Sequence, residues 1–175
     1  TTLVSIQWVN NETGVIQPIE AIGELCRTRH VPFHTDAAQA IGKLPMNVAK
    51  LKIDFLTLTS HKIHGPQGVG AVFAGNLRQL APVFFGGSQE DGIRPGTENM
   101  PGIVGFGTAA ECRSRDFVSI IDRLARLRDL FEQRVRAIVS DVAVNGEMAH
   151  RVCNTSNLLF AGVDGQALVA RLDQE

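Results

Sequence analysis

The stretch Phe55-Leu-Thr-Leu-Thr-Ser-His-Lys62 decides the class of fold that the sequence predicts. Its first five residues are apolar or β-branched, as in a short buried strand, and three polar residues follow directly. Three further runs of this kind occupy residues 3–9, 31–35 and 69–73. A turn cluster, Asn10 to Gly14, ends the first of these runs, and Asp36 ends the second. Short strands that end in polar groups are therefore the first prediction.

Helical patterns lie between and after these strands. One opens at Pro18, a second covers residues 100 to about 112, and the clearest 3.6-residue period covers residues 117–139. Strands separated by helical segments predict an α/β fold with a mostly parallel sheet and flanking helices. Beyond Ser140, strand-like pieces at 142–144 and 157–160 and a helical start at 166–172 indicate the beginning of a small α+β domain. We therefore expect part of a large domain at 1–115, a bridging helix at 116–139 and the start of a truncated small domain at 140–175.

The composition limits the class of protein. The chain has 175 residues, 44% of them hydrophobic and 20% charged, with 17 Lys and Arg against 18 Asp and Glu. This balance is too apolar for a disordered segment and too evenly charged for an electrostatic nucleic-acid binder. No apolar run approaches the ~20 residues of a membrane-spanning helix. We expect a globular protein that binds neither nucleic acid nor membrane.

The three cysteines, Cys26, Cys112 and Cys153, are widely separated and contain no Cys-x-x-Cys pair. That spacing predicts neither a zinc site nor a dithiol redox centre, so no metal is expected. It fits a reducing, cytoplasmic setting. The chain starts with Thr1 rather than methionine and stops inside a helical pattern, so we expect an internal piece of a longer protein.

Chemistry-bearing residues follow two of the predicted strands. One strand ends in His34-Thr-Asp-Ala-Ala-Gln39 and the other in Thr57-Leu-Thr-Ser-His-Lys62. Ligands of open α/β sheets bind in the crevice outside the carboxyl ends of the strands, so these groups are expected to converge there. A lysine at a strand end can form a Schiff base with a carbonyl, and an aspartate suits a pyridinium nitrogen. Lysine with aspartate is the pairing that a pyridoxal phosphate enzyme uses.

Each of these residues also has a plainer interpretation. Asp36 follows a strand, where an aspartate is commonly a helix cap, and Lys62 alone is commonly a solvated surface residue. His34 lies inside a strand, where a hydrogen-bonded core histidine is expected. The Gly65-x-x-Gly-x-Gly70 string is not a phosphate loop of the P-loop type, because it follows the lysine and opens a strand.

Four longer strings occur in order and make the pattern more specific. They are Trp8-Val-Asn-Asn-Glu-Thr-Gly14, His34-Thr-Asp-Ala-Ala-Gln39, Ser60-His-Lys-Ile-His-Gly-Pro-Gln-Gly-Val-Gly70 and Gly86-Gly-Ser-Gln-Glu-Asp-Gly-Ile-Arg-Pro-Gly-Thr-Glu-Asn99. Across essentially its whole length the chain resembles the cysteine desulfurases of the NifS/IscS type, which belong to the class-V aminotransferase family. The resemblance implies the large domain of a pyridoxal 5′-phosphate-dependent transferase of fold type I.

The resemblance also implies roles for individual residues. Lys62 is the catalytic lysine that carries pyridoxal 5′-phosphate, Asp36 pairs with the pyridine nitrogen, and Gln39 donates to the phenolic oxygen. Thr59, where many relatives have serine, and His61 bind the phosphate. Asn11 lies near cofactor and substrate, and Thr97, at the end of the Gly-rich 84–97 loop, reaches the cofactor of the partner in a homodimer.

The implied reaction converts L-cysteine to L-alanine and passes the sulfur to an enzyme cysteine as a persulfide. The sulfur then goes to an acceptor protein, such as an iron–sulfur scaffold, for cluster or thio-cofactor assembly. None of the three cysteines lies in the Ser/Gly-rich loop in which the family carries its sulfur-accepting thiol. We expect that loop beyond residue 175, together with the arginine for the substrate carboxylate. Part of the phosphate cradle and a ring-stacking histidine are expected before residue 1.

Two other functions stay open at this point. The first is another class-V aminotransferase or lyase that uses the same cofactor site. The second is an inactive, dimer-forming fragment. Because the sulfur acceptor and part of the phosphate cradle are expected elsewhere, we expect the 175 residues alone to be inactive.

Overall fold

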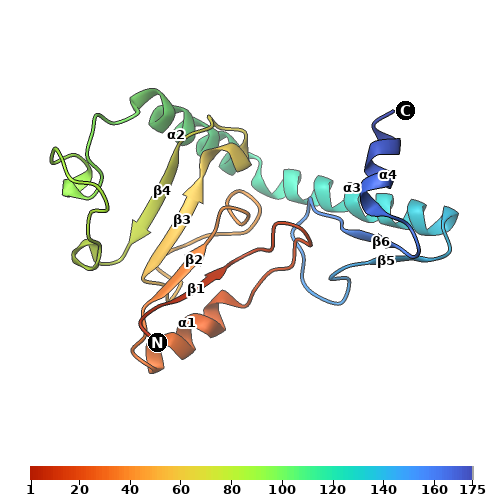
Figure 1. Cartoon of the computed structure of the whole chain (residues 1–175), viewed down its shortest axis with the longest axis horizontal. Helices are drawn as coiled ribbons and strands as arrows, with labels where there is room; N and C mark the ends of the chain where they lie inside the picture. Colours follow the sequence, from red (N-terminus) through yellow and green to blue (C-terminus); the bar gives the residue numbers. More distant parts are fainter. Residues whose placement is uncertain (175) are drawn as a thin grey trace. The chain divides into compact units, whose positions relative to one another are not determined.

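The structure is a computed structural model that describes residues 1–174, apart from the side chain of Arg78. Glu175, the last residue of the expected small domain, lies outside the described residues. The chain divides into two compact units (Figure 1). The first contains Thr1–Val9 and Gln17–Phe117, and the second contains Asn10–Ile16 and the residues from Val118 onward. Each unit is described by itself.

The first unit is built on a four-stranded sheet. Its strands are β1 (Val4–Gln7), β2 (Phe33–Asp36), β3 (Phe55–Thr59) and β4 (Gly70–Ala74), in that spatial order. β1, β2 and β3 are parallel, whereas β4 is antiparallel to β3. The short connection of residues 60–69 explains this reversal, because a return to a parallel strand needs a crossover of a dozen or more residues. The sheet is mixed but mostly parallel, as the sequence predicts.

Helices and short 3-10 turns complete the first unit. The helices are α1 (Ile19–Thr28) and α2 (Met100–Arg115), and the 3-10 turns are η1 (Ser60–Ile63), η2 (Leu77–Gln79) and η3 (Glu90–Gly92). α1 begins directly after Pro18 and buries Ile19, Gly23 and Cys26 on one face. α2 is capped at its start by Asn99, whose side chain accepts a hydrogen bond from the Gly102 N–H.

The two faces of the sheet differ in chemistry. Phe33, Thr35 and Leu56 are wholly buried on one side. On the other side a hydrogen-bonded row crosses three strands: the Ser5 hydroxyl lies 2.7 Å from His34 Nδ1, and Thr57 Oγ1 lies 3.3 Å from His34 Nε2. His34 is thus hydrogen-bonded within its strand, as expected, but it is half-buried and does not belong to the core.

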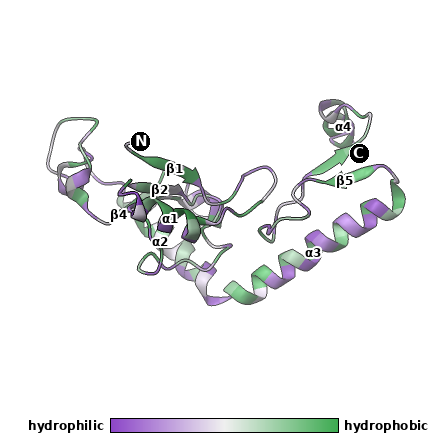
Figure 2. Ribbon diagram, turned by 90° about the horizontal axis from the view of Figure 1, so that it is seen from below, coloured by the Kyte–Doolittle hydropathy of each residue, from purple (hydrophilic) through white to green (hydrophobic). Residues whose placement is uncertain are grey.

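The second unit contains most of α3 (Phe117–Ile138), followed by the antiparallel pair β5 (Val142–Val144) and β6 (Leu158–Phe160) and by α4 (Gly165–Leu172). Apolar and polar residues alternate along α3 in Figure 2, in keeping with its 3.6-residue period. Asp164 caps α4 by accepting a hydrogen bond from the Ala167 N–H. Within residues 1–174 no helix is both long and apolar enough to cross a membrane.

One segment joins this unit from far away in the sequence. The Asn10–Ile16 loop follows β1 but pairs with residues 150–152. The Ile16 N–H donates to the His150 carbonyl at 2.9 Å, and the Val152 N–H donates to the Gly14 carbonyl at 2.9 Å. Gly14 has a φ of 74° and lies so close to Val152 and Thr155 that a side chain there would clash.

Candidate active site

The carboxyl ends of β2 and β3 lie side by side. Asp36, the last residue of β2, is in register with Thr57, and the Ala37 N–H donates to the Thr57 carbonyl at 3.0 Å. The residues that follow the two strands therefore leave the sheet at one edge (Figure 1). The structure brings five predicted site residues to this edge: Asp36, Gln39, Thr59, His61 and Lys62.

Asp36 is held by its own turn. Its Oδ1 accepts a hydrogen bond from the Ala38 N–H at 2.9 Å, the pattern of an Asx turn, and its side chain is exposed. The second carboxylate oxygen has no hydrogen-bond partner among the described residues. The carboxylate is thus oriented by the backbone and still has an oxygen free for a ligand.

Gln39 has a partner that sequence reasoning missed. The buried Lys43 donates from Nζ to Gln39 Oε1 at 2.6 Å. Because the amide oxygen accepts from an ammonium group, the Gln39 NH₂ is left as a donor for a ligand. The signal that could have found Lys43 is its spacing, four residues after Gln39 in a stretch of helical turns.

Thr59 and His61 form a hydroxyl–imidazole pair. Thr59 ends β3, and its Oγ1 lies 2.9 Å from His61 Nδ1 on the following 3-10 turn. Thr59 is half-buried and His61 is exposed. The contact occupies one ring nitrogen, and His61 Nε2 stays open to solvent. A hydroxyl next to an imidazole suits an anionic ligand.

Lys62 sits in the middle of η1, a single 3-10 turn between the end of β3 and His64. Its side chain is exposed and forms no hydrogen bond or ion pair with any described residue. His64 ends the turn in the left-handed region, with a φ of 66° and a ψ of 19°. A strained turn directly after a strand is a common feature of functional sites.

The floor of this turn is tightly packed. The Ser60 side chain is wholly buried, and its hydroxyl finds no hydrogen-bond partner in the described part of the chain. Gly65 lies directly on Ser60, so a side chain at Gly65 would clash with that hydroxyl. Gly105 of α2 lies directly on Pro66. The close contacts of Gly65 with Ser60 and of Gly105 with Pro66 thus fix the position of the segment that carries Lys62.

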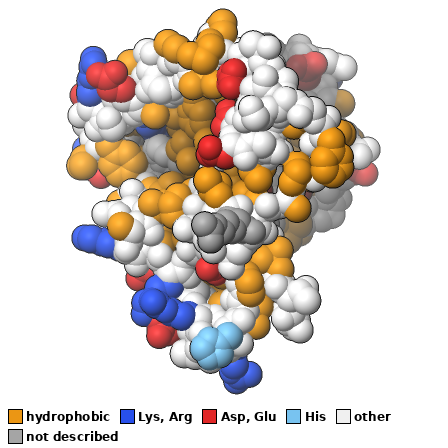
Figure 3. All heavy atoms as spheres, turned by 90° about the vertical axis from the view of Figure 1, so that its left-hand side faces the viewer, with side chains coloured by type: hydrophobic (Ala, Val, Ile, Leu, Met, Phe, Trp, Pro, Cys, Tyr) orange, Lys and Arg blue, Asp and Glu red, His pale blue; other side chains and the backbone are white. Residues whose placement is uncertain are grey.

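Thr97 lies in the long 81–99 loop and not on the β2–β3 edge. Its carbonyl accepts a hydrogen bond from Arg94 Nη1 at 3.2 Å, and its side chain is exposed. No hydrogen bond in residues 1–174 joins Thr97 to the other predicted site residues. The loop also carries Val83, Phe84 and Phe85, which are 74–89% exposed. Figure 3 shows hydrophobic side chains at several places on one face of the molecule.

Asn11 belongs to the second unit, in the Asn10–Ile16 loop. The neighbouring Asn10 holds this loop together: its Oδ1 accepts from the N–H groups of Glu12 and Thr13 and from the Thr13 hydroxyl, at 2.9–3.0 Å. Asn11 is exposed, and its side chain bonds to no described residue. The structure therefore separates a structural asparagine from one that is free to bind a ligand.

Two bidentate ion pairs join α3 to residues that follow it in the chain. Arg151 donates two hydrogen bonds to Glu132, at 2.8 and 3.0 Å, and both side chains are about nine-tenths buried. Hydrogen bonding to Arg151 lowers the pKa of Glu132 against the opposing effect of burial. A second bidentate pair, Arg136 with Glu147, is exposed, and there the hydrogen bond to Arg136 lowers the pKa of Glu147.

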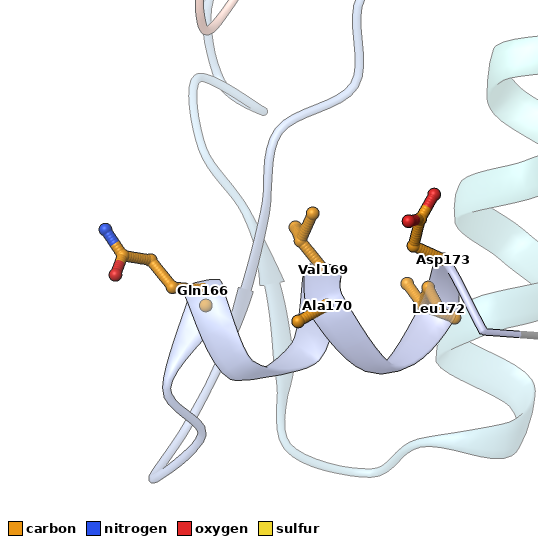
Figure 4. A pocket seen from close by; sticks show the side chains of 6 residues that line it. Gln166, Val169, Ala170, Leu172 and Asp173 are labelled. Atoms are coloured by element: carbon orange, nitrogen blue, oxygen red, sulfur yellow. The ribbon is translucent and has the colours of Figure 1, made fainter.

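Two surface hollows do not include the predicted site residues. One follows the apolar side of α4, where Val169, Ala170 and Leu172 are exposed between Gln166 and Asp173 (Figure 4). The other is lined by residues near the end of α1 and the start of β2, among them Arg27, His30 and Lys52. Lys52 is paired there with Glu24. No group of His, Cys, Asp and Glu suited to a metal ion occurs within the described part of the chain.

No disulfide links the three cysteines. Cys26 and Cys153 are buried, whereas Cys112 is exposed on α2.

Comparison with known proteins gives a consistent result. Residues 1–175 match the family described as aminotransferase class-V. A cysteine desulfurase of Nostoc sp. is 44% identical over 99% of this chain, and the chain spans 44% of that relative's length. The solved structure of a NifS-like protein from Rickettsia africae superposes on 98% of this chain and 48% of its own, with a TM-score of 0.94 and 34% identity. A structure described as SspA in complex with cysteine covers 98% of this chain and 46% of its own, with a TM-score of 0.72 and 34% identity.

Proposed function

The chain belongs to the class-V aminotransferase family, and from that premise we propose that the protein is a pyridoxal 5′-phosphate-dependent cysteine desulfurase. The observation that carries the proposal is the exposed, unpaired Lys62 on the same sheet edge as Asp36 and the Thr59–His61 pair. Relatives named cysteine desulfurase, at 41–44% identity, support the choice of reaction. The chain spans about 44% of their length, so the activity belongs to the proposal for the whole protein.

The residues at the edge fit the cofactor. A primary amine can bind the cofactor's carbonyl carbon, and Lys62 has no competing partner in residues 1–174. The Thr59–His61 pair can donate to a phosphate through His61 Nε2–H when the hydroxyl donates to Nδ1, or through the Thr59 hydroxyl when Nδ1–H donates to it. The free Asp36 oxygen is the acceptor that a protonated pyridine nitrogen needs. The donor set thus matches an aldehyde, a phosphate and a ring nitrogen.

When bound, the cofactor supplies an electron sink for carbanion chemistry at the substrate α-carbon. Asp36 holds the proton on the ring nitrogen. Gln39 presents its NH₂ to the phenolic oxygen, because Lys43 occupies the amide oxygen. Lys62 would be the base that moves the α-proton of the substrate. Asn11, whose amide has no partner among the described residues, would be a ligand contact, as the resemblance implies.

The substrate in this proposal is L-cysteine. One L-cysteine and one enzyme thiol yield L-alanine and an enzyme persulfide, so the sulfur is transferred with no external oxidant. A relative solved in complex with cysteine, SspA, supports this substrate. Burial makes Cys26 and Cys153 unsuited to attack, and Cys112 lies within a helix, so we do not assign the sulfur-accepting thiol to any of the three. The persulfide then serves an acceptor such as an iron–sulfur scaffold.

A homodimer is part of the same proposal. The exposed Val83, Phe84 and Phe85 form an apolar stretch in the loop that also carries Thr97. Such a stretch on a soluble protein favours burial against another surface. A second copy would cover it, and the Thr97 hydroxyl would reach the partner's phosphate. Three cysteines that form no disulfide among the described residues fit work in the cytoplasm.

The test is L-cysteine-dependent formation of alanine and persulfide by the full-length protein. Wild type is expected to release alanine, and Lys62→Ala is expected to lose this activity. If alanine forms from other amino donors instead of cysteine, the protein is another class-V aminotransferase or lyase. Activity that survives Lys62→Ala contradicts the assignment of the site.

A further inference from the structure

Asn10 shapes the Asn10–Ile16 loop from within, and one short segment fixes the loop in its unit. Its two antiparallel hydrogen bonds go to His150 and Val152, and Val15 forms a β-bridge with Arg151, the residue between them. The Asn157 side chain adds a hydrogen bond to the Glu12 carbonyl at 3.3 Å. The position of the 150–152 segment therefore sets the position of the loop and of Asn11.

That segment is held in turn by α3. The Arg151 guanidinium donates to both Glu132 oxygens, and Arg128 donates from Nη1 to the Val152 carbonyl at 2.7 Å. Both anchors come from one face of the same helix, at positions four residues apart. A bidentate pair fixes orientation as well as distance, since both N–H bonds of the guanidinium must align with the carboxylate.

The pair is an unusual choice if stability were its only role. The Arg151 and Glu132 side chains are only 8% and 11% exposed. Two apolar side chains of similar volume often stabilise a fold as well as a buried ion pair does, or better. What the ion pair adds is a single geometry for the strand segment that it holds. The nearby Arg136–Glu147 pair has the same bidentate form but is exposed, and it offers a matched control.

We propose that the Glu132–Arg151 pair is a positioning device for the Asn10–Ile16 loop and holds Asn11 in the orientation that ligand binding requires. The role of Asn11 in this statement rests on the proposed function, whereas the control of the loop by the pair does not. Glu132 and Arg151 are positioning residues that act through Asn11 and touch neither substrate nor cofactor.

The first test measures the loop without any cofactor. Hydrogen exchange at the Ile16 and Val152 amides is compared in the full-length wild type, Glu132→Gln and the control Glu147→Gln. Removing one partner of the buried pair is expected to speed exchange at both amides by about tenfold or more, and loss of the exposed pair by less than about threefold. Equal effects of the two variants would overturn the proposal.

The second test separates positioning from stability. Glu132→Leu/Arg151→Met replaces the pair by apolar side chains and keeps the protein folded even where Glu132→Gln does not fold. We expect this double variant to keep the thermal midpoint but to raise the KM for L-cysteine and shift the absorbance maximum of the bound cofactor, and we expect the same two changes from Asn11→Ala. Added to Asn11→Ala, it should cause no further change.

Three other results would count against the proposal or against the proposed function. Wild-type KM and absorbance in the stable apolar double variant would overturn the proposal, because the pair would then be replaceable. Full additivity with Asn11→Ala would overturn it also, because the pair would act by another route. If the wild type binds no cofactor at Lys62, the proposed function fails, while the exchange experiment still decides whether the pair controls the loop.

Discussion

Two glycines of helix α2 allow a test of the packing of this helix against the segment that carries Lys62. A Cβ added at Gly105 would lie 2.5 Å from Pro66 Cγ and 3.0 Å from Pro66 Cδ, whereas a Cβ at Gly107 meets nothing within 4 Å. Both residues lie inside α2 (Met100–Arg115), so alanine at either position gains about 1 kcal/mol of helix propensity. Overpacking against the rigid proline ring costs roughly 1–3 kcal/mol.

Helix propensity and overpacking together predict different stabilities for the two variants. Gly107→Ala should raise the free energy of unfolding by up to about 1 kcal/mol. Gly105→Ala should fall about 1–3 kcal/mol below Gly107→Ala, because only this variant clashes with Pro66. Urea unfolding of the two variants measures the difference directly. Adding Pro66→Ala should recover most of the loss in Gly105→Ala. Equal stability of the two alanine variants would refute the claim that α2 and the Lys62 turn are in tight contact.

Three further outcomes follow from individual residues. Hydrogen bonding to Arg151 lowers the pKa of Glu132 below its ordinary value of 4.5. The carboxylate therefore stabilises the fold above that pH and loses this effect as the pH falls. Below pH 4.5 the free energy of unfolding, measured with urea, should fall less steeply with pH in Glu132→Gln than in wild type. His64→Gly should raise the free energy of unfolding by about 1 kcal/mol in thermal melts, because it removes a left-handed non-glycine residue, and a lower melting temperature would contradict this. Lys43→Met should weaken cofactor binding, because it frees the Gln39 amide to rotate, and should lower the melting temperature by no more than a few degrees. Unchanged cofactor affinity in an absorbance titration would show that Lys43 does not orient Gln39.

Local pattern was sufficient to predict the elements of the fold. Helix α3 and strands β2 and β3 lie within a residue or two of the expected ranges, because alternation and 3.6-residue periodicity record which side chains are buried. The direction of β4 was not predictable from its own residues. It follows from the connection of residues 60–69, which is too short for a parallel crossover.

The sequence predicted only those site residues that belong to a recognisable motif and also lie at the end of a strand. Asp36 and Lys62 were expected on one sheet edge, and parallel pairing of β2 with β3 brings them there. Lys43 was missed because a lysine in a loop segment is ordinarily solvated, and its burial depends on tertiary packing. Glu132 was missed for the same reason, since it lies among the arginines and aspartates of the polar face of α3. The different roles of Asn10 and Asn11 became visible only in their hydrogen bonds.

The central claim is that Lys62 carries pyridoxal 5′-phosphate, and reductive trapping tests it most directly. Full-length protein is incubated with the cofactor and treated with borohydride, and its peptides are weighed by mass spectrometry. We expect one modified peptide, the one that contains Lys62, and no modified peptide in Lys62→Ala. Modification at another lysine, such as Lys43 or Lys52, or no modification in the wild type, would contradict it.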